Sequence, residues 1–344
     1  MTDRIIANLG WDEERAQDWQ QNPLSATGAF FGRVVRVERT TIHIAHEAGL
    51  HTVMATGFAV GDWVATDGET WVSLLPRRTQ LSRQSSDRTS AEQILAANID
   101  AVFVIEPVHP TPNLRRVERM LTLAWASGAR PIVVLTKHDL AEQDFVPDIE
   151  AVAHGVEVFA VSSTTGHNLS AVTALIHPGQ TFVFLGPSGA GKSSLVNALA
   201  GHDILATADV RGDGRGRHTT TRRELITIDG LGCIIDTPGI RAVGMTAHTH
   251  GLNATFDDIL DLAQHCRFTD CAHASEPGCA VTEAVAHSQL DPARLDNYKR
   301  IEREIAHHTR RKETHSRAEE RVETKSRRTA KRVIMKAKGR DSER

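Results

Sequence analysis

Cysteine is scarce in this chain, and long hydrophobic runs are absent. Four cysteines in 344 residues are too few for a disulfide-stabilised scaffold. Three of them cluster with a histidine, which indicates a metal site in a reducing compartment, and we expect a cytoplasmic protein. No stretch approaches the roughly 18 apolar residues of a membrane span, so no membrane association is expected. The acidic segment Met1–Trp19 lacks the apolar core of a signal peptide.

The formal net charge of -3 averages two unlike regions. Residues 299–344 carry 17 Lys and Arg against 8 Asp and Glu, a balance of +9, which leaves -12 for the remainder. This asymmetry predicts an acidic body with a basic tail directed at a polyanion. A solvated helix is the alternative for the tail, because acidic residues are interspersed. The length predicts two or three domains, and nothing in the sequence demands a dimer, so we expect a monomer.

The region 29–76 is rich in short β-like stretches and follows an N-terminal extension, residues 1–28. Most of the stretches are separated by Gly, Glu or Asp, and they lie at Arg33–Val37, Thr41–Ala45, His51–Thr56, Trp63–Thr66 and Thr70–Leu75. Five short strands in fewer than 50 residues predict a small barrel or sandwich. Residues 76–90 are polar and basic without periodicity, which predicts a linker.

From residue 101 the pattern changes to alternating strands and helices. Apolar strands are expected at Ala101–Ile105, Ile132–Leu135, Val156–Val161, Thr181–Leu185, Leu225–Ile228 and Cys233–Ile235. Helices are expected at Leu114–Ala126, capped by Asn113, and at Lys192–Leu199. This alternation predicts an α/β fold with a mainly parallel sheet covered on both faces. After His248 no strands are expected, and from Leu290 onward the chain is charged, helix-permissive and without long apolar faces.

A phosphate-binding loop follows the strand at 181–185. The segment matches the pattern G-x-x-x-x-G-K-[ST], in which glycines let backbone N–H groups turn toward the β-phosphate. Lys192 would place its charge on the β- and γ-phosphates, and Ser193 would offer a hydroxyl to Mg²⁺. The helix that follows adds its positive N-terminal end. The predicted nucleotide-binding residues of this loop are Gly186, Pro187, Ser188, Gly189, Ala190, Gly191, Lys192, Ser193 and Ser194.

Two loops that precede the phosphate-binding loop carry residues suited to guanine. Asp139 can accept both N1–H and N2–H of guanine, which adenine does not offer, and the stem of Lys137 can cover the base. Thr136 stands where G proteins usually have Asn, so one contact to the base edge is weaker or rearranged. A serine after the next strand can donate a backbone N–H to guanine O6. Each loop alone also fits an ordinary surface loop. The candidates are Thr136, Lys137, His138, Asp139, Ser162 and Ser163.

A second acidic motif and a glycine-rich segment complete the expected nucleotide site. The sequence D-T-P-G at 236–239 follows an apolar strand, so Asp236 can reach Mg²⁺ through water and the Gly239 N–H can lie near the γ-phosphate. Residues 212–221 are Gly-rich and basic, which predicts a mobile switch segment, with a solvated loop as the alternative. Thr220 in this segment is the predicted second Mg²⁺ ligand.

The order of the motifs is a rotation of the usual order in G proteins. The T-K-x-D loop and the serine loop come first, and the phosphate-binding loop and D-T-P-G follow, which predicts a circularly permuted GTPase domain at 77–247. Ile240 stands where many G proteins keep a water-positioning Gln, so slow intrinsic hydrolysis is expected. His218 is the nearest candidate to supply the missing function.

Three cysteines and a histidine form a second candidate site within 14 residues. The pattern C-x4-C-x-H-x5-C is typical of a closed, tetrahedral and structural zinc site without an open position for water. We therefore predict a zinc-binding domain at 248–300, although buried cysteines without a ligand are the alternative. Cys233 lies in a predicted strand and is interpreted as a core residue. The predicted zinc ligands are Cys266, Cys271, His273 and Cys279.

Together these motifs resemble the bacterial ribosome small-subunit-dependent GTPase A family over nearly the full length. The resemblance implies an OB-fold for residues 29–75 and a GTPase that is stimulated by the small ribosomal subunit. It also implies a role in late maturation of that subunit, with GTP hydrolysis governing release. The family's catalytic histidine would be His218, and its hydrophobic replacement for Gln would be Ile240. The basic tail at 301–344 is a departure whose role the resemblance does not settle.

Competing functions remain open at this point. The first is a GTP hydrolase, with Mg²⁺, that cycles between GTP and GDP on ribosomal RNA, which an OB-like barrel could bind. The second is an RNA-binding checkpoint module in which the nucleotide only sets affinity, and Ile240 keeps this alternative open because it predicts weak activity in isolation. A third, an ATP-dependent kinase or transporter component, is disfavoured by Asp139.

Overall fold

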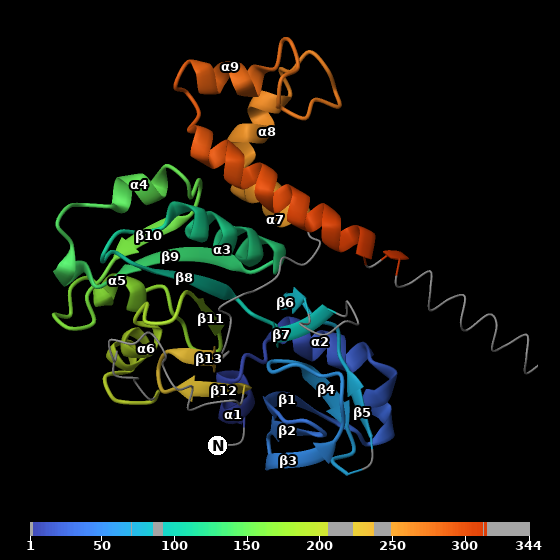
Figure 1. Cartoon of the computed structure of the whole chain (residues 1–344). Coiled ribbons are helices and arrows are strands. Elements are labelled where there is room, and N and C mark those ends of the chain that lie inside the picture. The colour runs from blue at the N-terminus through green and yellow to red at the C-terminus, as the bar shows by residue number, and fades with distance from the viewer. Residues whose placement is uncertain are drawn as a thin grey trace, which may run out of the picture.

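One large sheet connects the two halves of the molecule (Figure 1). The computed structural model describes residues 3–69, 71–84, 92–205, 223–236, 249–311 and 313–314. In this part of the chain eleven strands form a sheet with the order β10-β9-β8-β11-β13-β12-β1-β2-β3, and β4 and β5 join it through β1. The strands are β1 (Phe30–Val37), β2 (Thr41–His46), β3 (Gly49–Met54), β4 (Trp63–Thr66), β5 (Val72–Leu74), β8 (Ala101–Pro107), β9 (Arg130–Thr136), β10 (Glu157–Ala160), β11 (Thr181–Leu185), β12 (Arg223–Ile228) and β13 (Gly232–Asp236).

Most of the helices are short. The α-helices are α1 (Asp3–Asn8), α2 (Glu13–Gln21), α3 (Leu114–Ala126), α4 (Val146–Glu150), α5 (Leu169–Thr173), α6 (Lys192–Ala200), α7 (Thr249–Thr255), α8 (Asp257–Ala263) and α9 (Ala280–Ala286), with a further helix at 292–311. Two 3₁₀ turns are η1 (Pro23–Thr27) and η2 (His138–Leu140). Among the described residues no helix is both long enough and apolar enough to cross a bilayer.

The N-terminal strands β1–β5, for which the sequence predicted a small barrel or sandwich, form an antiparallel unit with the order β3-β2-β1-β4-β5, here called the barrel. β1 pairs with β2 on one side and with β4 on the other. The hydrophobic core of the unit consists of Val34, Ile42, Ile44, Val53 and Val64. Alternate side chains of β2 face the core, where Ile42 and Ile44 are fully buried. A side chain at Gly32 would collide with the Cγ2 atom of Ile44, so the close approach of β1 and β2 requires glycine there.

The expected linker at 76–90 is partly a strand, which corrects the prediction. Gln80–Gln84 is β6, and it pairs antiparallel with β7 (Glu92–Ala97) to form a separate two-stranded sheet. Leu81 is 1% exposed, but it is the single apolar residue of β6. A strand with one buried apolar residue produces no recognisable alternation, which is why the polar composition suggested a linker.

The GTPase-like half is a parallel sheet with helices on both faces, as predicted. β8 pairs in parallel with β9 and β11, and β11 pairs in parallel with β13. Alternate residues of β8 face opposite sides: Val102 and Val104 pack in the cluster that contains α3, whereas Phe103 and Ile105 pack in the cluster that contains α5 and α6. The helix predicted at Leu114–Ala126 has these bounds, and the Asn113 side chain caps it by accepting from the Arg116 N–H at 3.0 Å.

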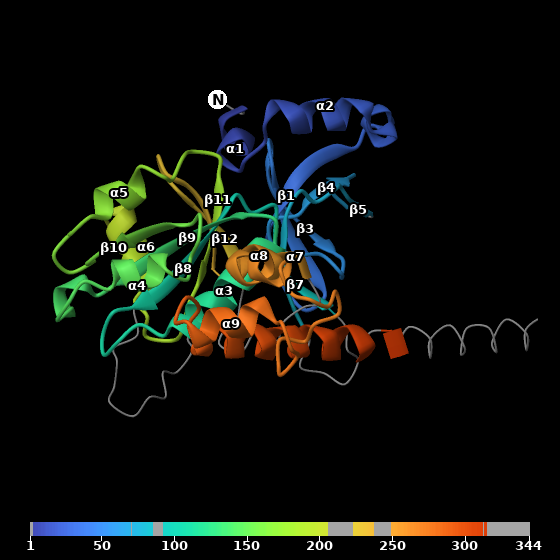
Figure 2. The same ribbon diagram turned by 90° about the horizontal axis from the view of Figure 1, so that it is seen from above.

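The helix at 292–311 corrects a second expectation. The sequence from Leu290 onward seemed to lack an apolar face, but Leu295, Tyr298, Ile301 and Ile305 are all at most 7% exposed and belong to the main hydrophobic core. Their spacing of three to four residues places them on one side of the helix, while many of the other positions carry charged residues. The helix also runs without interruption across residue 300, where the tail was expected to begin. Figure 2 shows it on the side of the molecule opposite to α1 and α2.

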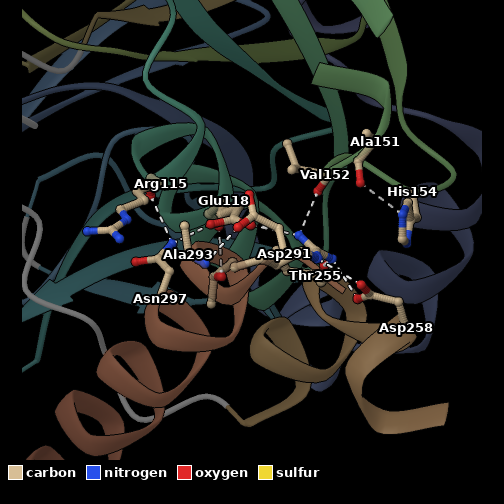
Figure 3. Close-up of polar contacts among 12 residues, drawn as sticks. Arg115, Glu118, Ala151, Val152, His154, Thr255, Asp258, Asp291, Ala293 and Asn297 are labelled. Carbon is tan, nitrogen blue, oxygen red and sulfur yellow. Dashed lines mark hydrogen bonds and ion pairs between the residues drawn. The ribbon is translucent and has the colours of Figure 1, made fainter. Parts of the chain in front are cut away.

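A buried polar network fastens this helix to the α/β sheet (Figure 3). The Arg294 guanidinium donates to Glu118 Oε1 on α3 at 2.7 Å and makes two bonds to Asp258 on α8, at 2.8 and 2.6 Å. It also donates to the carbonyl of Thr255 at 2.9 Å. The second oxygen of Glu118 accepts from Asn297 Nδ2. Because the side chains of Arg294 and Glu118 are 5% and 2% exposed, this pair is screened from water and joins α3, α7, α8 and the C-terminal helix.

Candidate functional site

The carboxyl ends of the parallel strands bring the sequence motifs to one edge of the sheet. The T-K-H-D segment begins at the end of β9, Ser162 follows β10, the glycine-rich loop follows β11, and Asp236 ends β13. From β8 the chain adds β9 and β10 on one side of the sheet, whereas β13 is added beyond β11 on the other side. The boundary between the neighbouring strands β8 and β11 is therefore the topological switch point of the sheet. Ligands of open α/β sheets bind at this position, outside the carboxyl ends of the strands.

The glycine-rich loop is curled around the side chain of Lys192. Its ammonium donates to the carbonyls of Gly186 and Pro187 at 2.9 and 2.8 Å. Gly189 and Gly191 have φ values of +76° and +87°, a region that side chains with a Cβ rarely occupy. Ser193 and Ser194 lie in the first turn of α6, beside the positive end of its backbone dipole. The loop therefore presents a cation and a helix N-terminus where phosphate groups would lie.

Thr136 links the two halves of the site. Its hydroxyl donates to the backbone carbonyl of Ala190 in the glycine-rich loop at 2.5 Å, and the residue is 2% exposed. The side chain in the position usually held by Asn therefore contacts the phosphate-binding loop.

Ser162 positions Asp139. The buried Ser162 hydroxyl donates to Asp139 Oδ1 at 2.5 Å and accepts the Thr165 N–H at 3.1 Å. Asp139 itself is exposed, and its second oxygen has no partner among the described residues. Sequence reasoning assigned the serine loop only a backbone N–H, and it missed this side-chain contact because the two residues come together only through the pairing of β9 with β10. The neighbouring Ser163 is partly exposed.

Two histidines form a further contact between the same loops. The rings of His138 and His167 stack with centroids 4.7 Å apart and an interplanar angle of 24°. Lys137, which precedes His138, adopts a left-handed backbone conformation with φ +61°. The chain therefore changes direction where β9 ends. His167 was missed in the sequence because nothing in its irregular loop indicates which residue it will meet.

A buried carboxylate at the end of β8 was also missed. Glu106 is fully buried, and its oxygens accept from the Asn113 N–H at 2.9 Å and from Arg116 Nε at 2.8 Å. The hydrogen bonds to Glu106 raise the pKa of Arg116. Because β8 lies between β9 and β11, this pair fixes the loop that separates the guanine motif from the phosphate-binding loop. The strand pattern read from Ala101–Ile105 stopped one residue before it.

Part of the predicted site lies outside the described residues. His218, Thr220, Gly239 and Ile240 fall in the two segments that the structure does not describe, 206–222 and 237–248. The backbone of Asp236 ends β13 and pairs with Glu224 of β12.

The predicted zinc ligands converge in the C-terminal module. The ligand atoms of Cys266, Cys271, His273 and Cys279 all lie within 4.8 Å of one another. The Sγ atoms of Cys266 and Cys279 are 3.8 Å apart, and each lies 3.6 Å from His273 Nδ1. A zinc tetrahedron with bonds of about 2.3 Å to sulfur and 2.0–2.1 Å to nitrogen has edges of about 3.8 and 3.6 Å. The residues therefore fit a tetrahedral zinc ion.

Neighbouring groups shape the zinc-binding loop. The Glu276 carboxylate accepts backbone N–H groups from Ala272, Ala274 and Ser275 at 2.8–3.1 Å. The backbone N–H of Glu276 itself, followed by these three, lowers the pKa of Glu276 to about 2. Lys299 on the C-terminal helix donates to the carbonyl of His273 at 2.5 Å. The loop between the ligands is therefore held both by its own carboxylate and by the helix that packs on the GTPase-like half.

Comparison with known proteins agrees with this geometry. The model of the RsgA GTPase family matches residues 74–246. A relative from Streptomyces coelicolor, named small ribosomal subunit biogenesis GTPase RsgA, is 41% identical and covers 97% of this chain and 95% of its own. A relative of the same name from Xanthomonas campestris is 43% identical over 72% of this chain and 69% of its own.

Solved structures share the fold. A crystal structure of YjeQ from Thermotoga maritima aligns with a TM-score of 0.59 and 25% identity over 81% of this chain and 99% of that one. A structure of YloQ, described as a circularly permuted GTPase, aligns with a TM-score of 0.54 and 26% identity over 81% of this chain and 95% of that one. The permuted motif order and the fold class expected from the sequence are thus confirmed. The chain belongs to the RsgA GTPase family and is a GTP-hydrolysing enzyme with a circularly permuted GTPase domain.

Proposed function

We propose that this GTPase acts in the biogenesis of the small ribosomal subunit, binds that subunit through its RNA, and hydrolyses GTP to GDP in response. The main support is the convergence of Asp139, Ser162 and the glycine-rich loop at one sheet edge, in a chain 41% identical to a small ribosomal subunit biogenesis GTPase. We further propose that it works as a monomer in the cytoplasm, where the subunit is made.

Guanine recognition falls to the two loops after β9 and β10. Asp139 would accept the N1–H and N2–H of guanine with its carboxylate, held in place by the Ser162 hydroxyl. Lys137 would cover the base, and the Ser163 region would donate a backbone N–H to O6. The hydrogen bond from Thr136 to Ala190 would hold these loops in a fixed position relative to the phosphate-binding loop.

Phosphate binding falls to the loop after β11. Lys192 would exchange its bonds to the Gly186 and Pro187 carbonyls for bonds to the β- and γ-phosphates. Mg²⁺ supplies charge compensation on the phosphates when bound, with Ser193 and Thr220 as its protein ligands and Asp236 reaching it through water. The Gly239 N–H would donate to the γ-phosphate.

Hydrolysis would depend on the partner. Ile240 has no polar group to orient the attacking water, and His218 is proposed to perform this role when the subunit is bound. The barrel at 29–76 would bind RNA, with the basic residues after 300 adding phosphate contacts. Zinc would be structural, because four protein ligands leave no position for water.

Turnover of GTP with and without purified small subunits tests this proposal. We expect slow turnover alone and strong acceleration by subunits, and we expect His218→Ala to remove the acceleration while basal turnover and GTP affinity persist. Replacement of an exposed histidine, such as His202, by Asn, Gln or Ser provides controls for the His218 variant. If subunits fail to accelerate the unaltered enzyme, the checkpoint alternative, in which nucleotide only sets RNA affinity, is favoured. Sedimentation with subunits in GDP and in a non-hydrolysable GTP analogue then measures that affinity.

A further inference from the structure

A polar pocket lies at the edge of the sheet opposite to the nucleotide site. Its volume is about 500 Å³, and its walls come from the α1–α2 junction, from the barrel, and from the residues that begin β8 and β11. Asp100 and Thr181 mark that edge, because they stand at the amino ends of two strands whose carboxyl ends carry the nucleotide motifs. The pocket is therefore separate from the GTP site, and three parts of the molecule contribute to it.

One wall of the pocket contains a buried guanidinium that has only neutral hydrogen-bond acceptors. Arg33 is 1% exposed, and it donates to the carbonyls of Gly61 and Asn98 at 3.2 and 3.0 Å, to the Thr181 hydroxyl at 2.8 Å, and to the Leu9 carbonyl. No carboxylate of the described chain lies within ion-pair distance of it. Burying a charge without a counter-charge is costly, so this site favours an anion nearby.

A second guanidinium of the pocket is still less satisfied. Arg15 is 9% exposed, and within the described chain its side chain makes one hydrogen bond, to Asn98 Oδ1 at 3.0 Å. Burial, and then the neighbouring charges of Arg78 and Arg33, lower the pKa of Arg15 to about 10. Burial is the main cause of this shift, and the positive charges of Arg78 and Arg33 add to it.

The carboxylates of the pocket leave this excess in place. Asp12 is engaged by Arg78, which donates to both of its oxygens. Asp100 accepts the Thr181 N–H at 2.6 Å. Together with Asp12 it partly offsets the charge of Arg15, and together with Asp62 it partly offsets that of Arg33. Three arginines thus face two carboxylates.

We propose that this pocket binds a small metabolite through an oxyanion group, a phosphate or a carboxylate, that pairs with Arg15 and Arg33. Guanidinium groups bind such groups with short, charge-assisted hydrogen bonds. Because the walls come from the N-terminal helices, the barrel and the GTPase domain, a bound anion joins these three parts at a distance from GTP. The ligand therefore holds the barrel against the GTPase domain.

Calorimetric titration of the full-length protein tests the proposal. The protein is first saturated with a non-hydrolysable GTP analogue and Mg²⁺, so that the β- and γ-phosphate positions of the nucleotide site are occupied, and is then titrated with inorganic phosphate or with acetate. We expect one binding event with at least one of these probes, and the comparison shows whether phosphate or carboxylate is preferred. Arg15→Gln keeps a donor for Asn98 but removes the charge, and should weaken binding about 10-fold or more.

Two further variants make the test specific. Asp100→Asn removes negative charge from the pocket but keeps an acceptor for the Thr181 N–H, so it should strengthen binding, an effect that damage to the fold would not produce. Arg130→Gln removes an exposed arginine paired with Glu157 and should leave the affinity unchanged. Absence of anion binding by the protein saturated with the GTP analogue overturns the proposal. Equal weakening by Arg15→Gln and Arg130→Gln overturns it as well, because binding would then follow overall charge.

Discussion

Replacement of Arg294 by methionine removes the positive centre of the network that joins the C-terminal helix to α3. Methionine fills a similar volume, but Glu118, with a side chain only 2% exposed, would keep a negative charge with Asn297 as its remaining side-chain partner. Asp258 would lose two hydrogen bonds as well, but its side chain is 24% exposed and can be hydrated. The cost therefore falls mainly on Glu118.

The size of the effect follows from the burial of the pair. Removal of one partner from a buried ion pair costs about 3–5 kcal/mol, whereas exposed pairs are worth at most about 1 kcal/mol. A loss of 3–5 kcal/mol corresponds to a rise of about two to three and a half orders of magnitude in the opening of the helix at 292–311. The double variant Glu118→Gln with Arg294→Met leaves no buried charge and should recover a substantial part of this loss.

The dependence on pH gives a second signature. Burial already raises the pKa of Glu118 above its usual range, although Asn297 and Arg294 oppose the shift. Without Arg294 the pKa rises further, so the folded state binds a proton more tightly than the unfolded state. Stability lost by the variant at neutral pH is then regained as the pH falls through the raised value. The difference from the unaltered protein should therefore shrink in acid.

Native-state hydrogen exchange measures this opening directly, since a chain of several domains does not unfold in one step. Amides of residues 292–311 should exchange faster in the Arg294→Met protein, while those of the barrel should not change. Arg130→Met, which breaks the exposed pair with Glu157, serves as the control. Exchange at 292–311 that matches this control would refute the reasoning, because it would mean that the buried pair contributes no more than a surface pair.

Three further outcomes are expected. Asp139→Asn should shift preference from guanine toward xanthine nucleotides, since the amide offers one donor that matches the 2-oxo group; competition binding with GDP and XDP measures this, and an unchanged preference removes Asp139 from the base site. Metal analysis should find about one zinc per chain, and Cys271→Ala should lose it and destabilise residues 249–311 while GDP binding persists; a zinc-free protein with normal stability contradicts this. Burial, and then His51, lower the pKa of His46. The stability of the barrel should therefore fall as the pH drops through about 6.5, the usual histidine value. His46→Phe should flatten that dependence in acid titrations followed by circular dichroism.

Features encoded in contiguous residues were predictable from the sequence. The helix at Leu114–Ala126 was predicted with its cap because Asn113 stands before a strong apolar period. The glycine-rich loop and the zinc cluster were recognised because each fits within a short segment with a fixed spacing. Strand bounds were less accurate, since β1 begins at Phe30, three residues before the predicted start.

Contacts between distant segments were not predictable. The bond from Thr136 to Ala190 spans 54 residues, and the bond from Ser162 to Asp139 depends on two loops that meet only after their strands pair. The apolar face at 292–311 escaped notice because its members are isolated among charged residues. Their role becomes visible only when α3 and the other helices supply the surface that they cover.

The pairing of β1 with β12 has a consequence for any attempt to isolate the GTPase domain. Arg36 and Val37 of the barrel lie opposite Glu224 and Arg223, so β12 is an interior strand of the large sheet. A shortened protein that began at residue 77 would leave β12 as a bare outer strand with unsatisfied N–H and C=O groups. Such strands recruit copies of themselves and lead to aggregation. The barrel thus protects the solubility of the enzyme to which it is attached.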